Sequence, residues 1–167
     1  MSNGGAIPAP SGAREQLAAH WHLLQRDFAA SQCARLSLRK AWLVAVLLDH
    51  VPDRIWDACI EAGAPLPHGA PDLPSYRAWL RSSAPALADI FTLVALQPDG
   101  PRLELLPVAV PAEAVEALPV EDFMISLYND NHIQQLMLTT AVGAIPAHDR
   151  LAAAMERLGK ELDLVRP

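Results

Sequence analysis

The segment at residues 36–49 is the feature that most limits how this chain can fold. Placed on a helix, its large apolar side chains cover more than half of the circumference. They are Leu36, Leu38, Trp42, Leu43, Val46 and Leu47. A helix that is apolar on most sides needs cover on most sides. We therefore expect it to be the central helix of the domain, or else part of an oligomer interface.

Proline and glycine predict where this helix ends and where the next elements begin. Pro52 lacks an N–H group and disfavours helix at the residue before it, so we expect the central helix to end there. A short amphipathic helix is predicted at residues 55–60, with Gly63 as its left-handed cap. Four prolines within residues 64–74 predict a loop or extended connector. Ser75 is predicted to cap the next helical stretch.

Two further stretches space their apolar residues four, three and four positions apart, as on one face of a helix. The first comprises Leu17, Trp21, Leu24 and Phe28, and the second comprises Leu151, Met155, Leu158 and Leu162. They predict a helix from residue 13 and a closing helix over residues 146–163, whose apolar stripe we expect to pack on a sheet.

The middle of the chain predicts two β-hairpins. Residues 90–96 and 103–110 are apolar and flank a Pro-Asp-Gly turn, with Pro107 indicating an edge strand or a bulge. Residues 123–128 and 132–139 flank Asn129, Asp130 and Asn131, which tolerate turn geometry. The alternative is one helix over residues 120–138, which would place three poor helix formers in its middle. A short helix is predicted at residues 111–118.

These elements predict an α+β fold. We expect a disordered tail at residues 1–12 and one domain over residues 13–167. Residues 13–85 are mainly helical, and residues 86–140 form a small antiparallel sheet of about four strands in two hairpins. The closing helix covers residues 146–163.

Composition narrows the function classes. The net charge of −6, with no Lys or Arg between Arg102 and Arg150, argues against general nucleic-acid binding. No apolar run approaches the roughly 20 residues of a membrane span, and the N-terminus does not resemble a secretion signal. Cys33 and Cys59 lack a CxxC partner, so free thiols and a cytoplasmic location are expected. The excess of arginine over lysine suggests a bacterial source.

No common chemical motif is present. The sequence contains no phosphate-binding glycine loop, no GxSxG elbow and no histidine spacing typical of a metal site. We therefore expect neither metal nor cofactor. The densest polar group is Glu121, Asp122, Asn129, Asp130, Asn131 and His132, in which a carboxylate-held imidazole could serve as a general base. The favoured explanation is that residues 129–131 form a hairpin loop for backbone reasons alone, with Glu121 and Asp122 solvated at the start of a strand.

Tryptophans concentrate in the helical half and favour a contact surface. Large aromatic side chains anchor protein interfaces. The predicted interface residues are Trp21, Trp42, Leu43, Val46, Leu47 and Trp56. We expect a homodimer that acts by protein–protein contact, with a further protein partner possible, and not an enzyme. The alternative is a small-molecule-binding protein or enzyme with a pocket near Asp130 and His132.

Overall fold

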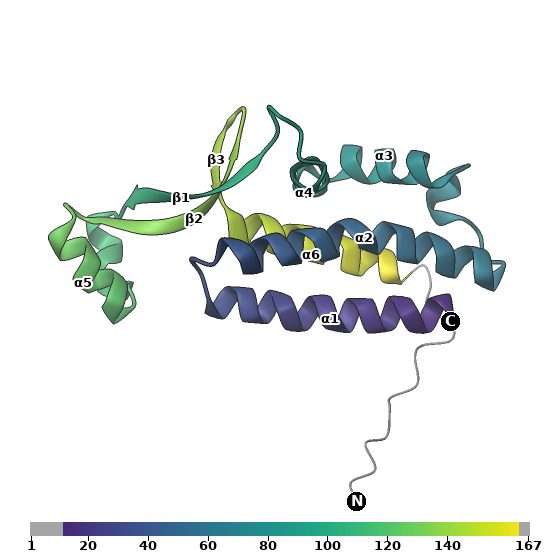
Figure 1. Ribbon diagram of the computed structural model, residues 1–167, viewed down its shortest axis with the longest axis horizontal. Coiled ribbons are helices and arrows are strands. Elements are labelled where there is room, and N and C mark those ends of the chain that lie inside the picture. The colour runs from purple at the N-terminus through teal and green to yellow at the C-terminus, as the bar shows by residue number, and fades with distance from the viewer. Residues whose placement is uncertain (1–11, 164–167) are drawn as a thin grey trace, which may run out of the picture.

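The computed structural model describes residues 12–163 and shows a mostly helical chain with one small sheet (Figure 1). The helices α1, α2, α3, α4 and α6 pack together as a body, from which strands β1 and β2 extend. The predicted α+β class and closing helix are confirmed, but the sheet has three antiparallel strands rather than about four. Apart from Gly12, the predicted tail lies outside the described residues.

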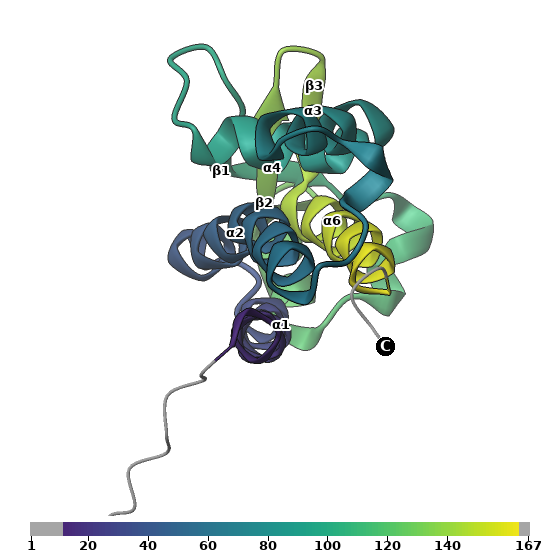
Figure 2. The same cartoon turned by 90° about the vertical axis from the view of Figure 1, so that its right-hand side faces the viewer.

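Helices α1 (Ala13–Cys33) and α2 (Leu38–Ala62) lie side by side along the body. Figure 2 shows α2 end-on between α1 and α4, which agrees with its predicted central place. Helix α2 begins at an N-cap, Ser37, whose side chain accepts from the backbone N–H of Lys40. It ends at Gly63 with φ 60°, the left-handed cap expected from the sequence.

The prediction that Pro52 ends the central helix is wrong, because α2 continues through it. Pro52 has no N–H to donate to the carbonyl oxygen of Leu48, four residues earlier. The carbonyls on both sides of Leu48 accept from side chains: Nε2 of His20 lies 2.8 Å from Leu47 O, and Arg77 donates to Asp49 O at 2.8 Å. The turns on both sides of Pro52 are also buried in the core. This packing outweighs the roughly 3 kcal/mol that proline costs inside a helix.

Helices α3 (Leu73–Ser83) and α4 (Pro85–Val94) form the upper layer in Figure 1. The cap of α3 is Asp72, whose side chain accepts from the N–H of Ser75, so the prediction of Ser75 as the cap is wrong. The strand predicted at residues 90–96 is also wrong. Residues 90–94 belong to α4, which starts five residues before residue 90 at a proline suited to a first turn, and residues 95–96 form the turn after it.

The sheet has the order β1-β2-β3. Strands β1 (Arg102–Ala109) and β2 (His132–Thr140) pair antiparallel over their whole length, whereas β3 (Gly143–Pro146) reaches only as far as Met137. The outer half of β1 and β2 is therefore a two-stranded ribbon. Pro107 lies in the edge strand β1, as predicted.

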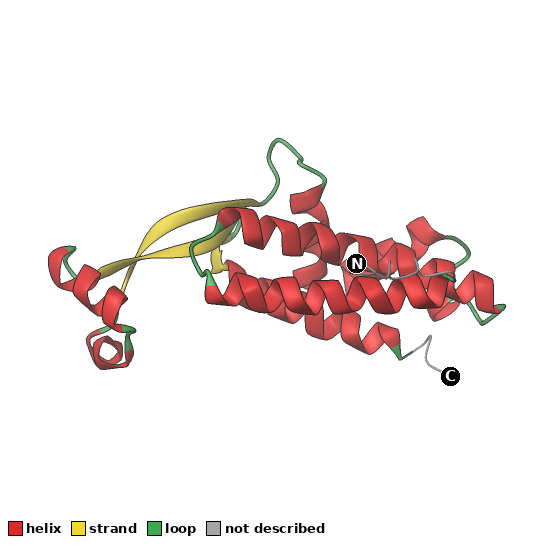
Figure 3. Cartoon of the chain, turned by 60° about the horizontal axis from the view of Figure 1, so that its bottom comes forward, coloured by secondary structure: helices red, strands yellow, loops and turns green. Residues whose placement is uncertain are grey.

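This ribbon carries two short helical segments at its far end, away from the body (Figures 1 and 3). They are η2 (Ala112–Ala117), a 3-10 helix where a short helix was predicted, and α5 (Val120–Tyr128). We call residues 102–140 the arm. The prediction of a second hairpin is wrong for its first strand, because residues 123–128 lie in α5. The 120–138 helix alternative is wrong in its second half, which is β2.

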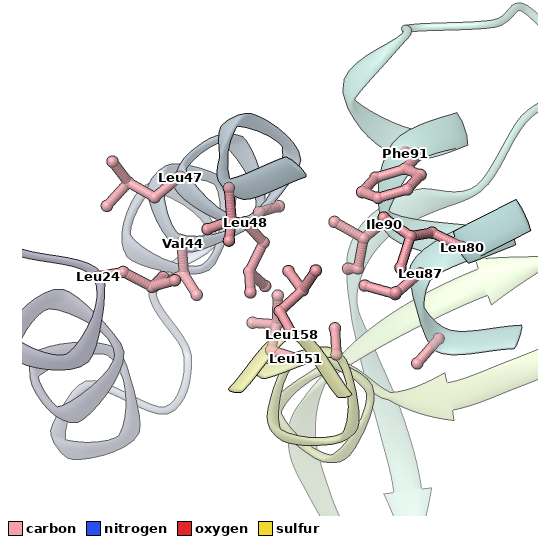
Figure 4. Close-up of a cluster of buried hydrophobic side chains, with 14 of the residues drawn as sticks. Leu24, Val44, Leu47, Leu48, Leu80, Leu87, Ile90, Phe91, Leu151 and Leu158 are labelled. Atoms are coloured by element: carbon pink, nitrogen blue, oxygen red, sulfur yellow. The ribbon is translucent and has the colours of Figure 1, made fainter. Parts of the chain in front are cut away.

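Helix α6 (Ala147–Leu162) returns to the body and closes the core. Its predicted stripe is confirmed, with Leu151, Leu158 and Leu162 buried. The stripe contacts α2 and α4 as well as β2, so it is not confined to a sheet face. Figure 4 shows Leu151 and Leu158 pointing toward Leu48 and Leu87. Among the described residues, no helix has the length and apolarity that crossing a membrane requires.

Candidate functional site

Helix α5 exposes its apolar side chains and buries two of its polar ones. Its only buried residues are Asp122 and Ser126. Five large apolar residues follow the i, i+3, i+4, i+7, i+8 spacing of one helix face. They are Val120, Phe123, Met124, Leu127 and Tyr128, with exposed fractions from 36% to 81%. We call these five residues the α5 apolar face.

The polar side of α5 is held against the rest of the chain. Arg35, in the loop after α1, donates to Asp122 Oδ2 at 2.7 Å. The Ser126 hydroxyl donates to Phe123 O at 2.8 Å, and the N–H of Asn131 donates to Ser126 O at 3.0 Å. The Arg35–Asp122 ion pair links α5 to the body, whereas the other two bonds lie within α5 and the turn that follows it. Asp122 is thus held inward while the apolar face is exposed.

Burial of the α5 apolar face would release several kcal/mol. A Val, Leu, Phe or Met side chain gains roughly 1.5–3 kcal/mol on passing from full exposure to full burial. The five side chains are only partly exposed, so burial of each would release only a fraction of this free energy. A contiguous apolar patch of this kind is typical of a protein contact surface.

A groove lies where the arm leaves the body. It has a volume of about 520 Å³, and its walls come from the start of α2, the end of α4 and the start of β1. We call it the root groove. Its apolar lining includes Leu38, Trp42, Leu93, Leu96 and Leu103, and its basic residues are Arg39 and Arg102.

The predicted acid–base residues gather near the end of the ribbon without forming a carboxylate–imidazole pair. His132 begins β2, and its Nδ1 lies 2.7 Å from the backbone oxygen of Asp130, so the ring bonds a carbonyl. The carboxylate of Asp122 is occupied by Arg35. Glu121 and Asp130 are exposed, and Asp130 has a left-handed φ of 51°, as its turn role requires.

His132 does line a second hollow. This hollow has a volume of about 290 Å³ and lies between β1, α5 and β2. Pro107, Ile125, Ile133, Asn129 and Gln134 complete its lining. The nearby Asp130 is not part of it.

The predicted interface residues are divided between core and surface. Leu47 and Trp56 belong to the buried core, while Trp21 and Trp42 are partly buried against it. Val46 is half-buried, and Leu43 is exposed. Of this set, Trp42 lines the root groove. Most of the apolar surface that the sequence suggested for a partner is covered by α1, α4 and α6 of the same chain.

A buried polar cluster in the body was missed by sequence reasoning. The carboxylate of Glu161, 3% exposed, accepts from Tyr76 Oη at 3.0 Å, from His68 Nε2 at 2.8 Å and from Arg157 at 2.5 Å. Burial, and then the neighbouring carboxylate, raise the pKa of Tyr76 above its ordinary value. The His68 ring also stacks on Trp79. Each group has a partner, so the cluster explains how α3 and α6 are joined.

Metal and thiol chemistry find little support in the part of the chain that the structure describes. There, no three His, Cys, Asp or Glu side chains converge on a point where an ion could bind. Cys59 is buried, and burial raises its pKa, which disfavours the reactive thiolate. Cys33 is exposed at the end of α1.

Comparisons of this chain with protein-family models, with curated proteins and with solved structures give no significant match. The geometry of the α5 apolar face and the root groove is therefore the basis for a functional assignment.

Proposed function

We propose that this chain acts by protein–protein contact and self-associates as a homodimer through the α5 apolar face. The observation that carries the proposal is the inverted burial of α5, whose Asp122 and Ser126 are buried while Val120, Leu127 and Tyr128 are exposed. A helix with this pattern is stable in water when a second surface covers its apolar side.

The ribbon supports the same proposal. A two-stranded ribbon is only marginally stable by itself, and it gains stability from packing on a further element. Among the described residues, no third strand pairs with the ribbon from Leu136 outward, and α5 is the helix at its end. A partner that covers α5 would stabilise the ribbon as well. We place this contact in the cytoplasm of a bacterium, as the composition and the free thiols suggest.

Sedimentation velocity at high micromolar concentration tests the proposal. The wild-type chain is expected to sediment at twice its 18.1 kDa mass. Leu127→Glu places a charge in the middle of the α5 apolar face and is expected to give a monomer, because burying an unpaired charge is strongly unfavourable. The matched control is Ile60→Glu, at an equally exposed position near the end of α2, which should remain dimeric. A wild-type monomer would refute self-association.

A second candidate function rests on the hollow beside His132. Its volume of about 290 Å³ lies near the lower end of the range typical of small-molecule sites, and an imidazole and an amide line it together with apolar side chains. A thermal-shift screen against metabolites tests this candidate, because a specific ligand raises the melting temperature by mass action. A shift that His132→Ala abolishes would support it, and a screen with no hit would count against it.

A further inference from the structure

The root groove and the α5 apolar face have complementary chemistry. The groove is lined with apolar side chains and bordered by Arg39 and Arg102. Within residues 12–163, Arg39 forms no ion pair, and Arg102 donates only to the carbonyl of Pro98. The guanidinium groups of both arginines are therefore available to pair with a carboxylate.

The end of the arm supplies the opposite charge. Residues 110–131 contain five carboxylates and no Lys or Arg. Only Asp122 is used, in its ion pair with Arg35. Across residues 12–163, no ion pair involves the other four carboxylates. They are Glu113, Glu116, Glu121 and Asp130. The end of the arm, with free carboxylates around an apolar helix face, thus matches an apolar groove with a basic border.

Within one chain, the two surfaces border opposite ends of β1. Arg102 and Leu103, the first residues of β1, line the groove, whereas α5 follows the other end of that strand. At about 3.3 Å per residue, the eight-residue strand spans more than 20 Å between its two ends. The Arg35–Asp122 ion pair links α5 to the loop after α1.

We propose that the α5 apolar face of each copy docks into the root groove of a second copy, with the two arms antiparallel. This inference rests on the self-association proposed above and names its two surfaces. The distance from α5 to the groove is the same on both copies, so a two-fold arrangement forms both contacts at once and closes the assembly. Pro107 in the edge strand cannot donate a ladder bond, which favours this helix-in-groove contact over pairing of the two ribbons.

Cross-linking between two pools of protein tests the pairing of these surfaces. Both pools carry Cys33→Ser to remove the exposed natural thiol, while Cys59 is fully buried. One pool carries Leu127→Cys on α5, and the other carries Leu96→Cys, which is 73% exposed at the groove. Under mild oxidation, we expect a disulfide-linked dimer from the mixture and none from either pool alone. Ile60→Cys replaces Leu96→Cys as the matched control and should give no product with the Leu127→Cys pool.

The outcomes separate this inference from the proposed function. A sedimenting wild-type dimer whose Leu96 and Leu127 positions do not cross-link, or cross-link no better than the Ile60 control, overturns the docking geometry and leaves self-association standing. A wild-type monomer overturns both. An intrachain disulfide in one chain carrying both cysteines also overturns the docking geometry. As a second measurement, Arg39→Glu is expected to weaken the dimer about tenfold, the usual scale of losing one close charge pair.

Discussion

Helices α2 and α5 are both rich in large apolar side chains, and the chain uses them in opposite ways. Helix α2 is covered by α1 on one side and by α4 and α6 on others, so most of its apolar residues belong to the core. Helix α5 contacts mainly β2 and turns its apolar face to solvent. The body therefore has its packing partners within one chain, whereas we propose that the arm finds its partner in a second chain.

This difference predicts different responses to the same kind of change. In the body, removing a side chain leaves a cavity or an unpartnered polar group, which lowers the free energy of unfolding of the single chain. In the arm, the same change alters association and leaves the stability of the dilute chain nearly unchanged.

The largest difference is expected between Leu48→Ala and Leu127→Ala. Leu48 is fully buried in α2, and its truncation should lower the free energy of unfolding by about 2–5 kcal/mol. Leu127 lies on the α5 apolar face, and its truncation should change this quantity by no more than about 0.5 kcal/mol in dilute protein. Urea denaturation at submicromolar concentration measures both. Equal losses would contradict the distinction between body and arm.

A somewhat smaller effect is expected from Glu161→Ala. This change leaves the Tyr76 hydroxyl and the Arg157 guanidinium without their acceptor, so we expect a loss of about 2–3 kcal/mol. Tyr76→Phe removes one donor and leaves Glu161 its other two bonds, and about 1 kcal/mol is expected. Thermal and urea unfolding measure both variants. A loss no larger for Glu161→Ala than for Tyr76→Phe would show that the cluster does not join α3 to α6.

Arg35→Ala is expected to act locally. The Arg35–Asp122 ion pair joins α5 to the body, but the arginine is half-exposed, so its loss should cost no more than about 1 kcal/mol. Amide hydrogen exchange in α5 should then become several-fold faster, while exchange around Leu48 stays unchanged. Uniform acceleration across the whole chain would mean that the arm and the body unfold together.

The smallest effect is a pH dependence in the body. Burial lowers the pKa of His20 below its ordinary value of 6.5, although the bond to Leu47 O opposes this shift. Below pH 6.5 the unfolded chain therefore binds more protons than the folded chain, and the contribution of His20 to stability is lost as the pH falls through its folded pKa. Urea midpoints at pH 7.5 and 5.5 measure this loss, which His20→Gln should reduce. A loss unchanged by this substitution would assign the pH dependence to other groups.

The elements that sequence patterns predicted well are those whose patterns lie within one continuous helix. The stripes of α1 and α6 and the cap at Gly63 needed no knowledge of distant residues. The errors at α4 and α5 have one physical cause. Short apolar runs such as residues 90–96 and 123–128 suit a strand or a buried helix equally well, and packing decides between them.

The α5 apolar face was nevertheless visible in the sequence. Val120, Phe123, Met124, Leu127 and Tyr128 show helical spacing when the window starts at Pro119 instead of residue 123. The turn-forming residues 129–131 favoured a hairpin instead. Other parts of the site were beyond sequence reasoning. The root groove joins α2, α4 and β1, and the Arg35–Asp122 ion pair spans 87 positions.

Oxidation of Met124 tests most directly whether a second copy covers the α5 apolar face. Met124 is about half-exposed in the single chain, whereas Met137 is buried in β2 and provides an internal control. Exposure governs the rate at which peroxide converts methionine to its sulfoxide. We expect the Met124 rate, measured by mass spectrometry, to fall severalfold as protein concentration rises from submicromolar to high micromolar, with Met137 slow throughout. A Met124 rate that is fast and independent of concentration would contradict the account.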